Sequence, residues 1–401
     1  MKATTTTHLN DENDGDPDYL PELEDANCLP TIPVTILTGF LGAGKTTLLQ
    51  FILSADHGKR IAVIENEFGD EIGIEKLVAK NGTDGRVVMD GFYELSNGCV
   101  CCSVRDDLVN TLEKLLEQRD RFDYILVETT GMADPGKVAS IFWVDDELEG
   151  RILLDGIVTL VDAPRLEFHL NHEDTQREVA AQVAYADRIL LNKGDLVQDG
   201  DVREHIERKV KEINGVAGVR WTERSKVDLD EILNIKSFTT TKVEQVEKEL
   251  RTLLNNGKDE DGFDLERKGD TRRDGSALHT GGMQTVCVRI SDGPLNQDKL
   301  ERWLGELLWQ QDTSSGAVGS DAARRQQLFR VKGVLAVADE PHKFILQAVH
   351  ELFEVYASEE RWCKDALDGT EERVSQVVFI GLNLTKGELL TGLQACVVSD
   401  K

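Results

Sequence analysis

The sequence contains no run of about 18 apolar residues, the length that a helix needs to cross a bilayer. Residues 1–13 lack the basic and apolar regions of a signal peptide, and acidic residues without arginine argue against a mitochondrial transit peptide. Basic residues are scarce: 46 Lys and Arg stand against 74 Asp and Glu, a formal net charge of -28. Because nucleic acids and anionic membranes are bound through an excess of Lys and Arg, neither is expected as a partner. Metal cations or basic partners fit this composition better.

The sequence also lacks the paired cysteines of a secreted disulfide framework, since three of its seven cysteines are clustered and the other four are isolated. This distribution indicates a reducing compartment. We therefore expect a cytoplasmic protein, with the nucleus left open as a second location.

Short apolar runs alternate with helical periodicity in the first half of the chain, which predicts a mostly parallel sheet covered on both faces. The expected strands lie at residues 32–37, 60–65, 124–128, 156–161 and 188–191. In the second half, strands are expected at residues 284–290, 327–337, 343–349 and 377–382, with a helix at 300–309. This second pattern predicts a smaller α+β domain.

The 401 residues are enough for two compact domains. We expect a disordered acidic tail at residues 1–30, an α/β domain with the mostly parallel sheet at 31–240, a helix and charged linker at 241–282, and the α+β domain at 283–398.

A phosphate-loop motif follows the first predicted strand and precedes a predicted helix, the context that such a motif requires. Its glycines let backbone N–H groups surround phosphates, and the helix N-terminus favours anions. Lys45 is expected to reach the β- and γ-phosphates as a catalytic residue, and Thr46 to ligate magnesium. The predicted nucleotide-binding residues of this motif are Gly39, Gly42, Ala43, Gly44, Lys45, Thr46 and Thr47.

A second phosphate-side element ends the predicted strand at residues 124–128 with an acidic residue, followed by Thr129-Thr130-Gly131. Glu128 stands where an Asp is usual and is expected to act on magnesium through water or to orient the attacking water. The Gly131 N–H is expected to sense the γ-phosphate.

The tetrapeptide Asn192-Lys193-Gly194-Asp195 follows another predicted strand and predicts guanine recognition. The Asp195 carboxylate can accept from guanine N1–H and N2–H together, Asn192 can meet O6 or N7, and the Lys193 stem can cover the ring. Adenine lacks this pair of donors, so GTP is favoured over ATP. Ser225 and Lys226 are candidates for additional backbone contacts to the base.

The cluster Cys99-Val100-Cys101-Cys102 predicts a soft-metal site, because thiolates suit zinc or copper(I). Cys99, Cys101 and Cys102 supply three ligands at most, which leaves an open coordination position of the kind a transfer site needs. Adjacent cysteines cannot point the same way from a strand, so a loop or the start of a helix at residues 103–118 must present them.

Two further features lie near these motifs. Glu67, within Asn66-Glu67-Phe68-Gly69, stands in the position of a nucleotide-responsive loop, where it can contact magnesium, activate water or lend a carboxylate to the metal. His169 and His172 can share a helical face, but an exposed polar pair is expected rather than a metal site.

Taken together, these residues resemble the CobW-type metal-chaperone GTPases. The resemblance rests on residues 39–47, 66–69, 99–102, 128–131 and 192–195. Residues 124–143, reading YILVETTGMADPGKVASIFW, and residues 222–229 are similar to the eukaryotic branch called zinc-regulated GTPase metalloprotein activators. Residues 283–398 look like the family's C-terminal domain.

The resemblance implies a zinc chaperone that uses GTP, Mg2+ and Zn2+ to load a client metalloprotein, the type 1 methionine aminopeptidase. In that branch a Pro-x-Leu-Val-Pro segment docks on the client's zinc finger. Leu20, Pro21 and Leu23 match its first half, whereas Glu24-Asp25 replace Val-Pro. The histidine-rich tail of some bacterial members is absent, which argues against bulk metal storage.

Our hypothesis is a cycle in which GTP orders residues 67–102, zinc sits on the three thiolates, and hydrolysis releases the metal to the client. A nickel or cobalt insertion GTPase of the hydrogenase, urease or cobalamin type is an alternative. A zinc sensor or buffer gated by the nucleotide, without transfer to a client, is another.

Overall fold

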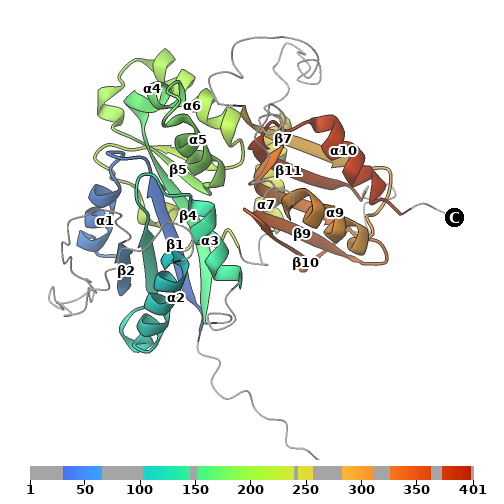
Figure 1. The fold of residues 1–401 in the computed structure, drawn as a ribbon, viewed down its shortest axis with the longest axis horizontal. Helices are drawn as coiled ribbons and strands as arrows, with labels where there is room; N and C mark the ends of the chain where they lie inside the picture. Colours follow the sequence, from blue (N-terminus) through green and yellow to red (C-terminus); the bar gives the residue numbers. More distant parts are fainter. Residues whose placement is uncertain are drawn as a thin grey trace, which may run out of the picture. The chain divides into compact units, whose positions relative to one another are not determined.

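The computed structural model describes residues 30–65, 103–144, 151–238, 243–255, 282–309, 326–362 and 373–398. Its helices and strands all belong to one compact unit, Thr31–Lys401 (Figure 1). No helix within these ranges is both long enough and apolar enough to cross a bilayer.

The first sheet has six strands in the order β2-β3-β1-β4-β5-β6, and every neighbouring pair is parallel. This arrangement confirms the predicted α/β class. Because β1 lies inside the sheet with later strands on both sides, the chain reverses its direction of travel beside β1, where such folds bind ligands. The strands are β1 (Ile32–Gly39), β2 (Ile61–Glu65), β3 (Tyr124–Glu128), β4 (Ile152–Asp162), β5 (Arg188–Asn192) and β6 (Gly218–Trp221).

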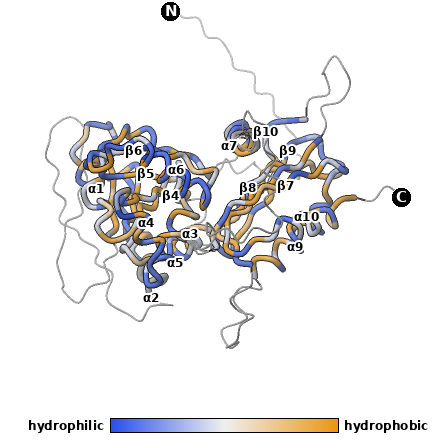
Figure 2. Tube along the Cα trace, turned by 90° about the horizontal axis from the view of Figure 1, so that it is seen from above, coloured by the Kyte–Doolittle hydropathy of each residue, from blue (hydrophilic) through white to orange (hydrophobic). Residues whose placement is uncertain are grey.

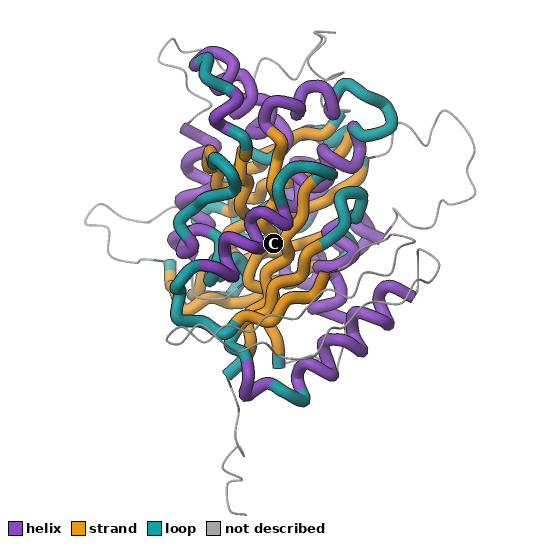
Figure 3. Tube along the Cα trace, turned by 90° about the vertical axis from the view of Figure 1, so that its left-hand side faces the viewer, coloured by secondary structure: helices purple, strands orange, loops and turns teal. Residues whose placement is uncertain are grey.

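Helices cover both faces of this sheet, because the buried strands carry apolar side chains on both (Figure 3). One face packs against α1 (Lys45–Ser54) and a segment with Ile232 and Ile235. The other face packs against the remaining helices. These are α2 (Ser103–Leu116), α3 (Pro135–Val144), α4 (Leu166–Leu170), α5 (Gln176–Tyr185) and α6 (Gly200–Ile213), and short 3-10 turns lie at η1 (Arg119–Arg121), η2 (Ala163–Arg165), η3 (Gly194–Leu196) and η4 (Leu229–Glu231).

The second sheet is antiparallel, with five strands in the order β10-β9-β8-β11-β7. Apolar side chains alternate between its faces: one face packs on α9 and α10, and the other packs on α7 and helices of the first domain. Figure 2 shows the hydrophobic residues along the strands of both sheets. The elements are α7 (Val243–Asn255), β7 (Met283–Ile290), α9 (Gln297–Trp309), β8 (Gln327–Ala336), β9 (His342–Val349), β10 (Leu352–Arg361), β11 (Ser375–Leu382) and α10 (Lys386–Ala395).

Strand β10 has no counterpart in the sequence analysis. Among the described strands it lies at the edge of the second sheet and pairs with β9, and most of its side chains are partly or fully exposed. Its first half is mostly apolar, with Leu352, Phe353, Val355 and Tyr356, but Glu354 interrupts it and the second half carries charged residues. The apolar pattern therefore covers only part of the strand, which weakens the signal on which the prediction relied.

A buried ion pair joins the two sheets. Asp187 directly precedes β5, and its carboxylate accepts from the Ile157 N–H at 2.9 Å. Two cations of β8 reach the same carboxylate: Arg330 pairs with Oδ1, and the Lys332 ammonium lies 3.2 Å from it. Both Asp187 and Arg330 have side chains that are 1% exposed. The guanidinium of Arg330 also lies 4.7 Å from the centre of the Phe238 ring.

This environment lowers the pKa of Asp187. Burial by itself raises the pKa of a carboxyl group, but the charges of Arg330 and Lys332 and the Ile157 N–H outweigh it. A carboxyl group with a lowered pKa contributes stability above its unfolded-state pKa, and that contribution is lost as the pH falls through the folded-state pKa.

We expect Asp187→Asn to lower the free energy of unfolding at pH 7 by about 3–5 kcal/mol, because it leaves two buried cations without a counter-charge. The difference from the unchanged protein should shrink below about pH 4, where the carboxyl group is protonated on unfolding. Denaturant unfolding at several pH values measures both effects. Asp174→Asn, at a side chain that is 89% exposed, is the matched control. Equal stability of Asp187→Asn and the unchanged protein at pH 7 would contradict this account.

Candidate nucleotide site

The predicted phosphate-binding and base-reading residues meet at the carboxyl ends of the parallel strands. The phosphate loop follows β1, Glu128 ends β3, and Asn192 ends β5. This edge lies beside the reversal at β1, the position at which doubly wound sheets bind nucleotides. Segments far apart in the sequence are thereby brought into one site.

The end of the phosphate loop is packed too tightly for any residue but glycine. Gly44 caps the N-terminus of α1 with φ of 109°, and a Cβ there would lie 2.4 Å from the Asn192 Nδ2 atom. Lys45, in the first turn of α1, is 8% exposed, and its ammonium donates to the Gly39 carbonyl at 2.8 Å. Thr46 and Thr47 are exposed at the same helix end. The loop therefore presents a lysine, two hydroxyls and a helix N-terminus.

Glu128 reaches the phosphate loop through the register of the sheet. Leu37 of β1 is paired with Glu128 of β3, and the Thr129 N–H donates to the Leu37 carbonyl at 2.9 Å. The Thr46 hydroxyl donates to Glu128 Oε1 at 3.5 Å. Hydroxyl and carboxylate oxygens are the donors that Mg2+ takes beside nucleotide phosphates, so this pair fits the predicted ion.

Gly131 follows Glu128 and lies against the phosphate loop. A Cβ at Gly131 would lie 2.7 Å from the Leu41 backbone nitrogen, so no larger residue fits there. The Gly131 carbonyl accepts from the Gln182 side chain at 3.0 Å, which fixes this turn to α5. The predicted γ-phosphate sensor is thus held beside the phosphate loop.

The Asn192 side chain joins three loops. Its amide donates to the Ala43 carbonyl at 2.8 Å and to the Ser225 hydroxyl at 2.9 Å. Its carbonyl accepts from the Ser225 N–H at 2.9 Å and from the Thr222 hydroxyl at 3.1 Å. The Ser225 hydroxyl in turn donates to the Gly44 carbonyl at 3.0 Å. We call these contacts the Asn192 latch.

The other two base-reading residues are presented differently. Lys193 adopts a left-handed backbone with φ of 63°, and its ammonium lies 2.6 Å from Asp162 Oδ2. Asp162 ends β4 directly opposite Asn192 in the parallel register. Asp195 lies in η3 and is exposed. Within the described ranges, no hydrogen bond or ion pair engages its carboxylate.

Sequence analysis did not single out Asp162. The usable signal was its position as the last residue of an apolar strand, next to the strand that delivers Asn192. Ser225 was predicted as a backbone contact to the base, and its hydroxyl has the additional role in the Asn192 latch. Its backbone, like that of Arg224, is left-handed, with φ of 57° and 52° respectively.

The expectation of an exposed polar pair at His169 and His172 is wrong for His169. Its ring is partly buried in α4, and its centroid lies 4.5 Å from that of Phe40 in the phosphate loop. Burial lowers the pKa of His169, so its neutral form is favoured. His172, with a side chain that is 51% exposed, agrees with the expectation. His169 therefore supports the phosphate loop by packing.

The predicted metal-binding residues Cys99, Cys101 and Cys102 lie outside the described residues, as does Glu67. The described part of the chain contains no cluster of three or more His, Cys, Asp or Glu side chains able to hold a metal ion. The described part of α2 begins at Ser103, so the prediction of how the cysteines are presented also falls outside the described residues.

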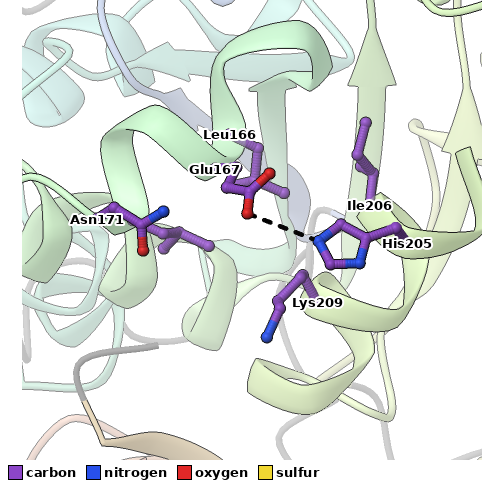
Figure 4. Close-up of a pocket in the computed structure, with 7 residues that line it drawn as sticks. Leu166, Glu167, Asn171, His205, Ile206 and Lys209 are labelled. Atoms are coloured by element: carbon purple, nitrogen blue, oxygen red, sulfur yellow. Dashed lines mark ion pairs between the residues drawn. The ribbon is translucent and has the colours of Figure 1, made fainter. Parts of the chain in front are cut away.

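A small hollow lies between α4 and α6 (Figure 4). It is lined by the apolar side chains of Leu166, Leu170 and Ile206, with Asn171 and Lys209 at its margin. The His205 imidazole lies 3.8 Å from the Glu167 carboxylate across it. None of the predicted phosphate-binding or base-reading residues lines this hollow.

Family models match both halves of the chain. Residues 33–220 match the nucleotide-binding domain of CobW/HypB/UreG, and residues 283–397 match the C-terminal domain of the cobalamin synthesis protein cobW. These matches confirm the resemblance of both the first domain and residues 283–398 to this family.

Full-length relatives agree with the family models. The chain is 32% identical to zinc-regulated GTPase metalloprotein activator 1 of Schizosaccharomyces pombe, over 89% of this chain and 84% of the relative. It is 32% identical to the zinc chaperone YjiA of Escherichia coli, over 89% of this chain and 96% of the relative. A crystal structure of Zn(II)-bound YjiA GTPase from E. coli superposes with a TM-score of 0.62 at 29% identity, covering 92% of this chain and all of that one. The chain therefore belongs to the CobW/HypB/UreG family and carries the CobW C-terminal domain.

Proposed function

We propose that this protein is a zinc chaperone that couples GTP hydrolysis to the transfer of Zn2+ into a client metalloprotein. The observation that carries the proposal is the convergence of Lys45, Thr46, Glu128 and Asp195 at one edge of the first sheet. The names of the fission yeast and E. coli relatives support the coupling of a GTPase to zinc.

In this proposal, the phosphates of GTP lie against the phosphate loop and the N-terminus of α1. Lys45 exchanges the Gly39 carbonyl for the β- and γ-phosphates, whose negative charge it neutralises. Thr46 and Glu128 hold Mg2+, which supplies positive charge to the phosphate oxygens when bound. Glu128 is also placed to orient the attacking water, and Gly131 to donate its N–H to the γ-phosphate. No arginine is found within these motifs, so hydrolysis without a stimulating partner is expected to be slow.

Guanine is selected by the Asp195 carboxylate, which accepts from N1–H and N2–H together. The Lys193 stem covers the ring while its ammonium pairs with Asp162. Asn192 holds the phosphate loop and the segment at residues 222–225 in register. The base and phosphate subsites are thereby joined by the Asn192 latch.

The zinc site proposed for Cys99, Cys101 and Cys102 is connected to the nucleotide site through the chain itself. Strand β2 ends at Glu65, which is paired with Glu128 in the parallel register, and α2 begins at Ser103. The chain between these two points carries the cysteines and Glu67. A change at the γ-phosphate can therefore act on the metal ligands.

The proposed client is the zinc finger of a type 1 methionine aminopeptidase, bound through Leu20, Pro21 and Leu23. This part of the proposal rests on the resemblance of residues 20–23 to the first half of a docking segment. Glu24 and Asp25 depart from that segment, so the client contact is tested separately from the chemistry of the site.

Asp195→Asn should exchange GTP for XTP as the preferred nucleotide. Xanthine carries an oxygen at C2 in place of the guanine amino group, and an amide can donate to that oxygen where a carboxylate cannot. Affinity for GTP should fall about 100-fold, as expected when a buried hydrogen-bonding match is lost. Competition binding of GTP and XTP in the presence of Mg2+ measures the change, with Asp201→Asn, an exposed carboxylate on α6, as control. Retention of GTP preference by Asp195→Asn would exclude guanine reading by this residue.

Cys101→Ala should leave GTP binding unchanged and lower Zn2+ affinity at least about tenfold, because it removes one of three thiolate ligands. The control is Cys287→Ala, since burial raises the pKa of that thiol and makes it a poor metal ligand. Chelator competition with GDP or a GTP analogue bound measures zinc affinity in both states. Identical zinc affinity in the two states would exclude the proposed coupling. Tighter binding of Ni2+ or Co2+ in the same assay would favour a metal-insertion GTPase of that type.

GTP hydrolysis should be stimulated by Zn2+ and an isolated methionine aminopeptidase zinc finger together. Phosphate release is measured with each component alone and with both, using Lys45→Met as the inactive control. A variant with Leu20→Ala and Leu23→Ala should lose the stimulation by the finger but keep the basal rate. Stimulation by zinc alone would retain the chaperone and exclude this client, whereas no phosphate release under any condition would favour a sensor or buffer.

A further inference from the structure

Arg203 of α6 holds the turn that carries Asp195. Its Nε atom donates to the Val197 carbonyl at 2.7 Å, and its Nη2 atom donates to the Gly194 carbonyl at 2.8 Å. These two carbonyls flank Asp195 and Leu196 in the chain. The guanidinium therefore bridges both ends of η3, and its planar fork suits two acceptors that must keep a fixed separation.

A second set of contacts fixes Arg203 itself. Its guanidinium lies 4.7 Å from the centre of the Trp221 ring, which projects from β6. The Trp221 Nε1–H donates to Glu207 Oε1 at 2.7 Å, and Glu207 lies one turn beyond Arg203 on α6. The indole is thus held between two residues of the same helix. Stacking against this ring restricts the motion of the guanidinium.

The turn has little freedom to move against this support. The Gly194 N–H donates to the Thr222 carbonyl at 2.9 Å, and the Val197 N–H donates to the Gly194 carbonyl at 3.1 Å. A Cβ on Gly194 would lie 3.3 Å from the Trp221 ring and 3.4 Å from Arg203 Nη2. Asp195 therefore has a backbone fixed on both sides, while its own carboxylate makes no hydrogen bond or ion pair within the described ranges.

We infer that Arg203 is a positioning residue for guanine discrimination, acting through η3 to aim the Asp195 carboxylate. The inference rests on the proposed role of Asp195 as the guanine reader. A carboxylate that accepts from N1–H and N2–H at once must be correctly oriented, because the two donors lie in one plane with fixed spacing. Arg203 supplies that orientation without contacting the base.

Inosine nucleotides isolate this effect. Hypoxanthine has the N1–H donor but lacks the 2-amino group, so the preference for GTP over ITP reports the second hydrogen bond alone. If η3 is less firmly held, the Asp195 carboxylate accepts less well from N1–H and N2–H together. The preference for GTP over ITP then falls. Loss of general stability, in contrast, lowers the affinity for GTP, ITP and ATP by the same factor.

The test compares equilibrium affinities of the full chain for non-hydrolysable GTP, ITP and ATP analogues with Mg2+. Arg203→Met keeps an apolar stem against Trp221 and removes both donors, and it should reduce the GTP-over-ITP preference about tenfold. Arg203→Lys retains one donor and should give an intermediate preference. Arg208→Met is the control, because Arg208 lies on the same helix with a side chain that is 58% exposed and pairs only loosely with Glu204 at 3.7 Å.

An unchanged GTP-over-ITP preference in Arg203→Met, or equal losses for all three nucleotides, overturns the inference. If thermal unfolding shows that Arg203→Met does not fold, Arg203→Lys is used instead. An unchanged GTP-over-ITP preference in that variant also overturns the inference. The Asp195→Asn variant separates this failure from that of the proposed function. If Asp195→Asn prefers XTP but the Arg203 variants keep the GTP-over-ITP preference, Asp195 reads guanine and Arg203 does not position it.

Discussion

The Asn192 latch is the interaction on which the nucleotide site depends. One buried amide makes four hydrogen bonds, to the phosphate loop and to the segment that carries Thr222 and Ser225. Because Asn192 also precedes the turn that carries Asp195, the latch sets the spacing between the phosphate loop and the predicted base subsite. A buried amide left with unpaired groups is destabilising, so the three loops are stable only when they adopt this arrangement together.

Buried polar contacts also connect the first domain to the C-terminal domain. Asp187 anchors the start of β5 to β4 through Ile157 and accepts two cations from the second sheet. Thr285 of β7 adds contacts to the end of α6 through the Ile213 carbonyl and the Gly215 N–H. The strand that delivers Asn192 and the helix that carries Arg203 are both tied to the C-terminal domain. This domain therefore supports the elements that carry Asn192 and Arg203, beside the predicted base-reading residue Asp195.

The site also separates hard from soft ligands along the chain. Thr46 and Glu128 place oxygen donors beside the phosphate loop, where they suit Mg2+. The clustered thiols suit Zn2+ and occur between β2 and α2. Glu65, the last described residue before the thiols, is paired with Glu128 in the parallel register. Oxygen groups that suit Mg2+ and thiols that suit Zn2+ therefore belong to different segments of the chain.

By itself, the sequence determined the parallel α/β domain, the smaller α+β second domain and the contiguous motifs, because buried strands and phosphate loops have local patterns of spacing. Edge strand β10 was not predicted because its apolar residues occupy only half of a partly exposed strand. Only the tertiary structure revealed that Asp162 pairs with Lys193, 31 positions away, and that Ser225 reaches Gly44 across 181 positions. Arg203 likewise acts on Gly194 and Val197 only because α6 folds back over η3. The sequence names the groups that carry the chemistry, whereas their orientation depends on partners that only folding brings within hydrogen-bonding distance.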